Sequence, residues 1–290
     1  MLAGRLKSLN PNITLVFYYN ANLCLPGYRL YNLTAQHAPY WWLRNSSNNP
    51  FIAPIDSGAG ARPPFPYNAH GGGVPVYDFT VPDVRTAWVQ ECLDMTSPTG
   101  GFDGCMADRW VRTPFKHHLP PGYTPEEVKR WTAARDKATA ELSSKAKEHG
   151  VYLVGVGAPS SQVDAVSNPG YGAHGEKSLL EQMQIAGAGT GLLASYKPRS
   201  VGNSFETQLA KFLIGAARGH YFGAGSWTCN HTSREGVTWH PEYSRPLGHP
   251  LGNATQTGTL WSRRFGSCLR VMRTIVGSLS IYGFYFYIFS

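Results

Sequence analysis

Two aspartates flank one short apolar run, GFDGCMADRW at residues 101–110. Asp103 lies near its start and Asp108 at its exit. If the run is a strand, the two residues are about 16 Å apart at about 3.3 Å per residue, too far to act as one bond-breaking pair. Strand alternation also places Asp108 on the face of Met106 and Asp103 on the face of Cys105. Asp108 is therefore the candidate for chemistry. Asp103 is expected to bond backbone or a helix end near the strand start.

Several apolar runs rich in Val, Ile, Tyr and Phe predict the strands that would position such residues. They occupy residues 13–19, 74–80, 102–108, 151–157, 191–196 and 220–225. Most are continuous rather than alternating, which is typical of parallel strands buried on both faces. The sequence therefore predicts a parallel sheet covered by helices.

Helices are predicted between these runs. Thr124 and Glu127 have the spacing of a capping box at the start of the clearest one, and Gly150 stops it. Its apolar stripe is Val128, Trp131, Arg135, Ala138 and Leu142. Further helices are expected at 80–95, 177–187 and 204–219, and a helix at the amino end is expected to run straight into the strand at 13–19.

Repeated strand and helix units predict a (β/α)₈ TIM barrel. The alternative, an open dinucleotide-binding sheet, needs a glycine-rich turn after an early strand, whereas GAGTG at 187–191 follows a helix. The barrel is expected over residues 1–262, lacking or truncating its first strand. An irregular C-terminal β-hairpin or tail is expected at 263–290.

Functional side chains of such barrels lie where the strands end. The candidates at these exits are Tyr19, Asn20, Asp78, Asp108, Arg109, Trp110, Tyr196 and Trp227. Aromatic rings, amides and carboxylates together suit a sugar, since its C–H faces stack on rings and its hydroxyls need fixed partners. Cleaving a glycosidic bond takes two carboxyl groups, of which Asp108 would be one. The structural alternative for Asp108 is a helix cap or an ion pair with Arg109.

The segment VYDFTVPDVRTAW followed by GFDGCMADRW resembles the third and fourth βα units of glycoside-hydrolase-like TIM barrels, related in motif to α-galactosidase and polygalactosaminidase barrels. The likeness covers most of the chain. It implies hydrolysis of a poly- or oligosaccharide, with Asp108 as nucleophile or base and a glutamate at the sixth strand end as acid/base. Glu176 fits that place better than Glu181, because it precedes a predicted helix. Cys268 departs from the family, where a glycine is expected.

Two alternatives remain on the same barrel. A non-catalytic glycan-binding protein would use Trp110 and Trp227 without a second carboxylate facing Asp108. A truncated, inactive pseudoenzyme would follow from the missing strand, because an incomplete barrel has an open edge.

Composition and motifs argue against a nucleic-acid-binding protein, a metal- or cofactor-dependent enzyme and a membrane-spanning protein. The net charge is +8, but the cations are scattered and no nucleic-acid motif accompanies them. No four-ligand metal set and no cofactor motif occur, and the apolar stretch at 275–289 is shorter than the roughly 20 residues of a membrane span.

Cysteines and sequons bear on the compartment. Five cysteines leave at least one without an internal partner. Asn-x-Ser/Thr sequons begin at Asn12, Asn32, Asn45, Asn230 and Asn253, which suggests a glycoprotein of the secretory pathway. The amino-terminal run itself does not have the pattern of a signal peptide.

Overall fold

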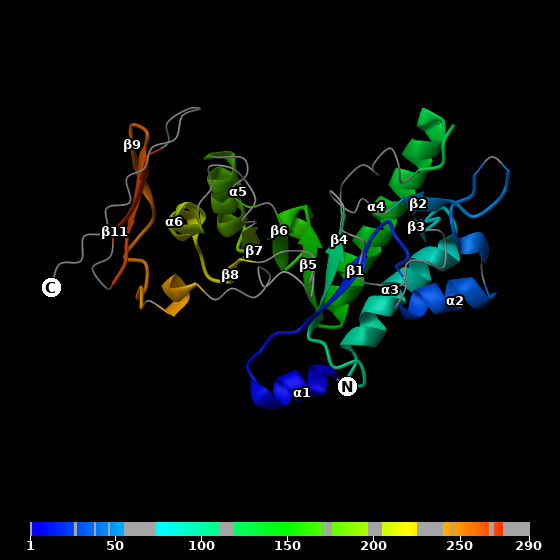
Figure 1. The fold of residues 1–290 in the computed structure, drawn as a ribbon, viewed down its shortest axis with the longest axis horizontal. Helices are drawn as coiled ribbons and strands as arrows, with labels where there is room; N and C mark the ends of the chain where they lie inside the picture. Colours follow the sequence, from blue (N-terminus) through cyan, green and yellow to red (C-terminus); the bar gives the residue numbers. More distant parts are fainter. Residues whose placement is uncertain are drawn as a thin grey trace. The chain divides into compact units, whose positions relative to one another are not determined.

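The computed structural model shows helices alternating with strands (Figure 1). It describes residues 2–25, 28–37, 39–45, 47–54, 73–110, 119–169, 171, 176–196, 205–224, 240–244, 246–266 and 270–274. These belong to two compact units, Met1–Asp164 and Ala165–Ser290. Each unit has its own parallel strands and its own helices.

The first unit is built on three parallel strands. They are β1 (Val16–Asn20), β4 (Gly104–Asp108) and β5 (Tyr152–Val156). Strand β4 pairs in parallel with both β1 and β5. Helix α3 precedes β4, α4 joins β4 to β5, and the short 3-10 helix η5 follows β5; their bounds are Pro82–Thr96, Pro125–Glu148 and Ser160–Gln162. The predicted strands at 13–19, 102–108 and 151–157 are therefore confirmed.

Helix α1 (Leu2–Leu9) confirms the helix predicted at the amino end (Figure 1). It does not run straight into the strand as predicted, because a turn separates it from β1. The capping box of α4 is also confirmed. The Thr124 hydroxyl accepts from the Glu127 backbone N–H at 3.2 Å, and the Glu127 carboxylate accepts from the Thr124 N–H at 2.8 Å. Such a cap stabilises a helix by about 1 kcal/mol. Four of the five residues of the predicted stripe are buried in α4, namely Trp131, Arg135, Ala138 and Leu142, and Val128 is half-buried.

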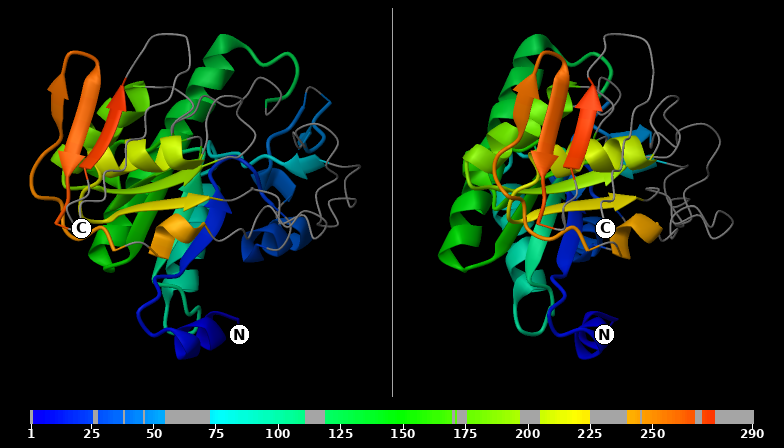
Figure 2. Two further views of the ribbon diagram at one scale, coloured as in Figure 1. Left: turned by 60° about the vertical axis from the view of Figure 1, so that its left-hand side comes forward. Right: turned by 90° about the vertical axis from the view of Figure 1, so that its left-hand side faces the viewer.

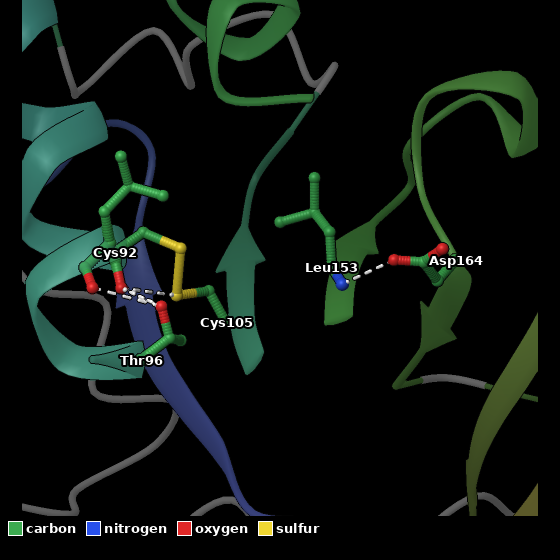
Figure 3. The surroundings of a disulfide bond; sticks show 6 residues. Cys92, Thr96, Cys105, Leu153 and Asp164 are labelled. Atoms are coloured by element: carbon green, nitrogen blue, oxygen red, sulfur yellow. Dashed lines mark hydrogen bonds between the residues drawn. A yellow bond between two sulfur atoms is a disulfide. The ribbon is translucent and has the colours of Figure 1, made fainter. Parts of the chain in front are cut away.

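Helix α3 covers one face of β1 and β4. The Tyr19 ring stacks on Trp88 at 4.8 Å, and the Trp88 indole N–H donates to the Asn20 carbonyl at 3.2 Å. A disulfide joins Cys92 of α3 to Cys105 of β4, with the Cα atoms 5.9 Å apart (Figure 3). Because side chains alternate along a strand, the residues directly before and after Tyr19 and Cys105 point to the opposite face of these two strands.

Two aspartates each make a pair of hydrogen bonds to the backbone near the amino end of a strand. Asp103 donates its N–H to the Leu15 carbonyl at 2.8 Å, and its carboxylate accepts from the Leu15 N–H at 2.7 Å. Asp164 repeats this with Leu153, at 2.9 and 2.8 Å (Figure 3). Asp103 also binds Lys7 of α1. The prediction that Asp103 bonds backbone and a helix near the strand start is confirmed.

The prediction of a parallel strand at 74–80 is wrong. Residues Gly73–Pro75 form β3, which pairs antiparallel with β2 (Ile52–Pro54). Single bridges then join Val76 to Leu23 and Tyr77 to Trp42, also antiparallel. Helices α2 (Arg29–His37) and η1 (Pro39–Trp41) belong to the same excursion between β1 and α3. The run is apolar because it is buried within this excursion, and burial alone does not fix strand direction.

The second unit has parallel strands β6, β7 and β8 and helices α5 and α6. Their bounds are Ala165–Asn168, Gly191–Tyr196, His220–Ala224, Glu176–Gly187 and Phe205–Gly215. Strand β7 pairs in parallel with both β6 and β8. The strands predicted at 191–196 and 220–225 and the helices predicted at 177–187 and 204–219 are confirmed, the last with an earlier end.

An antiparallel sheet follows the short helix η7 (Pro241–Ser244) in the same unit. Its strands β9, β10 and β11 span Thr255–Thr257, Leu260–Arg264 and Arg270–Thr274 (Figure 2). The predicted boundary at 262/263 falls inside β10. Residues 275–290 lie outside the described part of the chain.

Arg263 of β10 caps the carboxyl end of α6. Its guanidinium donates to the carbonyls of Leu213, Ile214 and Ala216. Its Nε–H donates to the Gly252 carbonyl at 3.0 Å. The last carbonyls of a helix have no partner within the helix, so this side chain satisfies groups that would otherwise need water.

The structure confirms the α/β class, with parallel strands separated by helices in both units. Eightfold closure of a barrel stays a prediction.

Candidate active site

Asp108 lies at the carboxyl end of β4, beside the carboxyl end of β1. The parallel register pairs it with Asn20 and pairs Met106 with Tyr18. The side chain of Asp108 is 17% exposed. Asp108 therefore reaches solvent at the end of the sheet where parallel α/β proteins carry their functional groups.

Two donors hold one oxygen of this carboxylate. The Tyr18 hydroxyl donates to Asp108 Oδ2 at 2.9 Å, and the Asn20 side-chain amide donates to the same oxygen at 3.3 Å. Arg109 Nε lies 4.0 Å from Oδ2. The predicted ion pair with Arg109 therefore exists at long range, alongside shorter bonds from neutral groups.

Asn20 is itself fixed in orientation. Its side-chain oxygen accepts from the backbone N–H groups of Asn22 and Leu23, both at 2.9 Å. With the oxygen engaged by the chain that follows β1, the amide nitrogen points toward Asp108. The Ala21 N–H also donates to the Asp108 carbonyl at 2.9 Å, which extends the β1–β4 pairing past the strand ends.

Tyr18 keeps its proton in this setting. Burial raises the pKa of its hydroxyl far above the ordinary value of 10.0, and the neighbouring charge of Asp108 raises it further. Both effects disfavour the tyrosinate, because it would be a second buried anion next to a carboxylate. The hydroxyl is therefore a permanent donor to Asp108.

Arg109 has a left-handed backbone, with φ at 64°. A residue with a Cβ rarely adopts this conformation, which costs about 1 kcal/mol or more. It ends the strand abruptly and turns the chain, so that the Trp110 N–H donates to the Val156 carbonyl at 3.2 Å. Local strain of this kind is common at functional sites.

Two predicted sugar-contacting aromatics lie in the core instead. Tyr19 is 1% exposed and faces Trp88 of α3. Trp110 is fully buried, and its indole N–H donates to the Gln162 side chain at 2.8 Å. Neither ring has an open face on which a sugar could stack. For these two residues the predicted contact with substrate does not agree with the structure.

The other predicted residues have different surroundings. Asp78 is half-buried, and its carboxylate accepts from the backbone and hydroxyl of Thr80 in the turn before α3. Tyr196 ends β7 and Glu176 begins α5, but their side chains lie outside what the structure describes, as does all of Trp227. Glu181 has a side chain 44% exposed and lies 3.9 Å from Lys177, in keeping with a solvated helix residue.

Tyr18 is the site residue that the sequence prediction missed. Residues 18, 20, 106 and 108 share one face of β1 and β4, so the strand alternation that paired Asp108 with Met106 also selects Tyr18 rather than Tyr19. Applying the same parity to β1 would have found it.

The described part of the chain offers neither a cluster of metal ligands nor a helix that could span a membrane. Within the described ranges, no group of three or more His, Cys, Asp or Glu side chains is arranged to hold a metal ion. None of the helices in that part of the chain has both the length and the apolar character needed to cross a bilayer.

Parallel strands that alternate with helices define an α/β protein. The hydrogen-bonded carboxylate of Asp108 lies at the carboxyl end of a strand, which is the edge of the sheet where proteins of this class place their active sites. The sequence identifies the family. The model of Hypothetical glycosyl hydrolase family 15 matches residues 7–268, so the chain belongs to this glycosyl-hydrolase-like family. No curated protein sequence matches it.

Several solved glycosidases are similar in structure. The glycoside hydrolase domain of PelA from Pseudomonas aeruginosa is 12% identical, with 77% of this chain and 81% of that domain covered and a TM-score of 0.43. A GH31 sulfoquinovosidase from E. rectale is 20% identical, with coverages of 74% and 32% and a TM-score of 0.44. For the α-galactosidase from Lactobacillus brevis the values are 11%, 77%, 28% and 0.41. The chain thus spans most of the solved PelA domain and about a third or less of the other two chains.

Proposed function

We propose that this protein hydrolyses glycosidic bonds of a poly- or oligosaccharide, with Asp108 as the catalytic nucleophile or base. The observation that carries the proposal is the arrangement at the end of β4. Asp108 is partly exposed there, and one of its oxygens accepts hydrogen bonds from Tyr18 and Asn20. Membership of a glycosyl-hydrolase-like family supports the reaction class.

The reaction needs a second carboxyl group that acts as an acid. That group gives its proton to the glycosidic oxygen while the bond from this oxygen to the anomeric carbon breaks. In a retaining enzyme Asp108 attacks the anomeric carbon, and water then releases the sugar. In an inverting enzyme Asp108 takes a proton from water as the water oxygen bonds to that carbon. In both cases one water is consumed, and its proton and hydroxyl are divided between the two products.

Glu176 is proposed as the acid. The support is its place at the start of α5, directly after the short segment that follows β6, together with the surface ion pair that Glu181 makes instead. The alternative of a glycan-binding protein without catalysis is less well supported, because one of the two tryptophans on which it relied, Trp110, is buried.

We also propose that the chain folds in an oxidising compartment, as a protein of the secretory pathway. The support is the disulfide between Cys92 and Cys105, since such bonds persist mainly outside the reducing cytosol. Cys24 is buried and keeps its thiol.

The test compares Asp108→Asn, at the last residue of β4, with Asp103→Asn, the same substitution directly before the first residue of that strand. Release of reducing ends from a panel of poly- and oligosaccharides measures turnover, and NMR of the first-formed anomer distinguishes retention from inversion. Asp108→Asn is expected to lower turnover about a thousandfold, a typical contribution of a positioned catalytic carboxyl group. Asp103→Asn is expected to leave it within about threefold. Equal turnover of the two variants would remove Asp108 from the mechanism.

A further inference from the structure

We infer that Tyr18 is the positioning residue of the site: together with Asn20 it engages Oδ2 of Asp108 and so leaves Oδ1 as the oxygen that meets the substrate. This inference rests on the function proposed above, and it assigns a role to a residue outside the segment GFDGCMADRW.

The geometry comes from the pairing of two strands. Asn20 lies directly opposite Asp108 in the β1–β4 register, and Tyr18 lies one side-chain pair earlier on the same face. The long tyrosine side chain reaches forward to the carboxylate, and the short asparagine side chain meets it from beside. Both donors therefore end on Oδ2, at 2.9 and 3.3 Å.

The three described side chains that bond or face this carboxylate all approach the same oxygen. Arg109 Nε is also nearest to Oδ2, at 4.0 Å. In the part of the chain that the structure describes, no donor lies within hydrogen-bonding distance of Oδ1. The two oxygens of an ionised carboxylate are chemically equivalent, so the donors fix the plane of the group and bind whichever oxygen faces them. The oxygen that faces away from Tyr18 and Asn20, here Oδ1, is the one available to attack carbon or to accept a proton from water.

The chemistry of the donors suits this role. A tyrosine whose hydroxyl remains protonated stabilises the carboxylate without competing for the position of the substrate. Asn20 is 3% exposed and held by two backbone N–H groups, so its amide cannot swing away. Preorganised donors of this kind orient a reacting group before the substrate arrives.

Adjacent tyrosines give a matched test. Tyr18→Phe removes the hydroxyl that donates to Asp108. Tyr19→Phe makes the same chemical change one residue further, on the face that packs against Trp88. Among the residues that the structure describes, the buried Tyr19 hydroxyl has no hydrogen-bond partner, so its loss should not disturb the fold. Tyr18→Phe is expected to lower kcat/KM about ten- to a hundredfold, as for a lost hydrogen bond to a charged group. Tyr19→Phe should leave kcat/KM unchanged.

Equal kinetics of the two variants on a substrate that the wild type cleaves would overturn the inference. A second arm needs no substrate. It uses NMR of protein in which the tyrosine ring carbons are isotope-labelled. The signal of Tyr18 is assigned by its absence in Tyr18→Phe. This signal should shift when Asp108 is replaced by Asn, whereas the signal of Tyr19 should not. No shift would overturn the positioning role. A third outcome separates the two claims. In it, the NMR shift occurs while the wild-type protein cleaves no glycan and Tyr18→Phe binds glycans as well as the wild type does. In that case the contact between Tyr18 and Asp108 is correct, but the proposed function fails, and the positioning role of Tyr18 fails with it.

Discussion

Arg263 caps the carboxyl end of α6, and the loss of stability on removing its guanidinium follows from the hydrogen bonds that it makes. Its Nη1 carries two hydrogens for three carbonyls of the α6 end, and its Nε–H serves Gly252, so about three hydrogen bonds operate at a time. At about 1 kcal/mol net for each bond, the total is about 3 kcal/mol. Arg263 is half-buried, and the released carbonyls can regain water, which lowers the expected loss to about 2 kcal/mol.

The perturbation is Arg263→Met, which keeps the aliphatic stem and removes the guanidinium. Urea unfolding, followed by a probe in the second unit, should show a midpoint lower by about 1 M. Arg264→Met is the matched control, because Arg264 is the next residue of β10 and its side chain is exposed. Its effect should stay within about 0.5 kcal/mol. If the two variants unfold at the same urea concentration, the capping role assigned to Arg263 is wrong.

Two further predictions concern the first unit. Burial raises the pKa of Glu91, which is 5% exposed and accepts from the Arg29 N–H at 3.0 Å. The folded state therefore holds this proton more tightly than the unfolded state, and stability falls as pH rises above the ordinary carboxyl value. Glu91→Gln keeps the acceptor and should gain stability over wild type at neutral pH but not in acid; a gain of equal size at both pH values, in urea titrations, would contradict this. Arg109→Gly should relieve the left-handed strain and stabilise the protein by up to about 1 kcal/mol while lowering turnover; a lower melting temperature would show that the side chain matters more than the strain.

Much of the fold could be predicted because local signals agree with the tertiary structure. The capping box at Thr124 and Glu127 fixed the start of α4 to the residue, and a helical stripe fixed its buried face. The segment at 74–80 was misassigned because a buried apolar run looks the same whether its partner strand is parallel or antiparallel. Strand β6, with four residues, is too short to give a periodic signal.

The candidate site was predictable in part. Asp108 and Asn20 lie at strand ends, as the position of apolar runs indicates, and the register of β1 with β4 brings them together. Trp110 could not be placed in this way. Alternation along an extended strand would put it on the face of Asp108, but the left-handed turn at Arg109 ends the strand and sends the ring into the core. No residue type in the sequence signals that turn, because the residue that adopts it is an arginine rather than a glycine or asparagine.

The disulfide between α3 and β4 has a consequence for the covalent continuity of the chain. Because Cys92 and Cys105 are bonded, the residues between them form a closed covalent ring that includes the exposed Pro98 and Thr99. A single backbone cut within that ring leaves the protein in one piece, and the strand that ends at Asp108 stays attached to the helix on which it packs. Only reduction combined with the cut would separate them, so the redox state of the surroundings decides whether such a nick would be harmless.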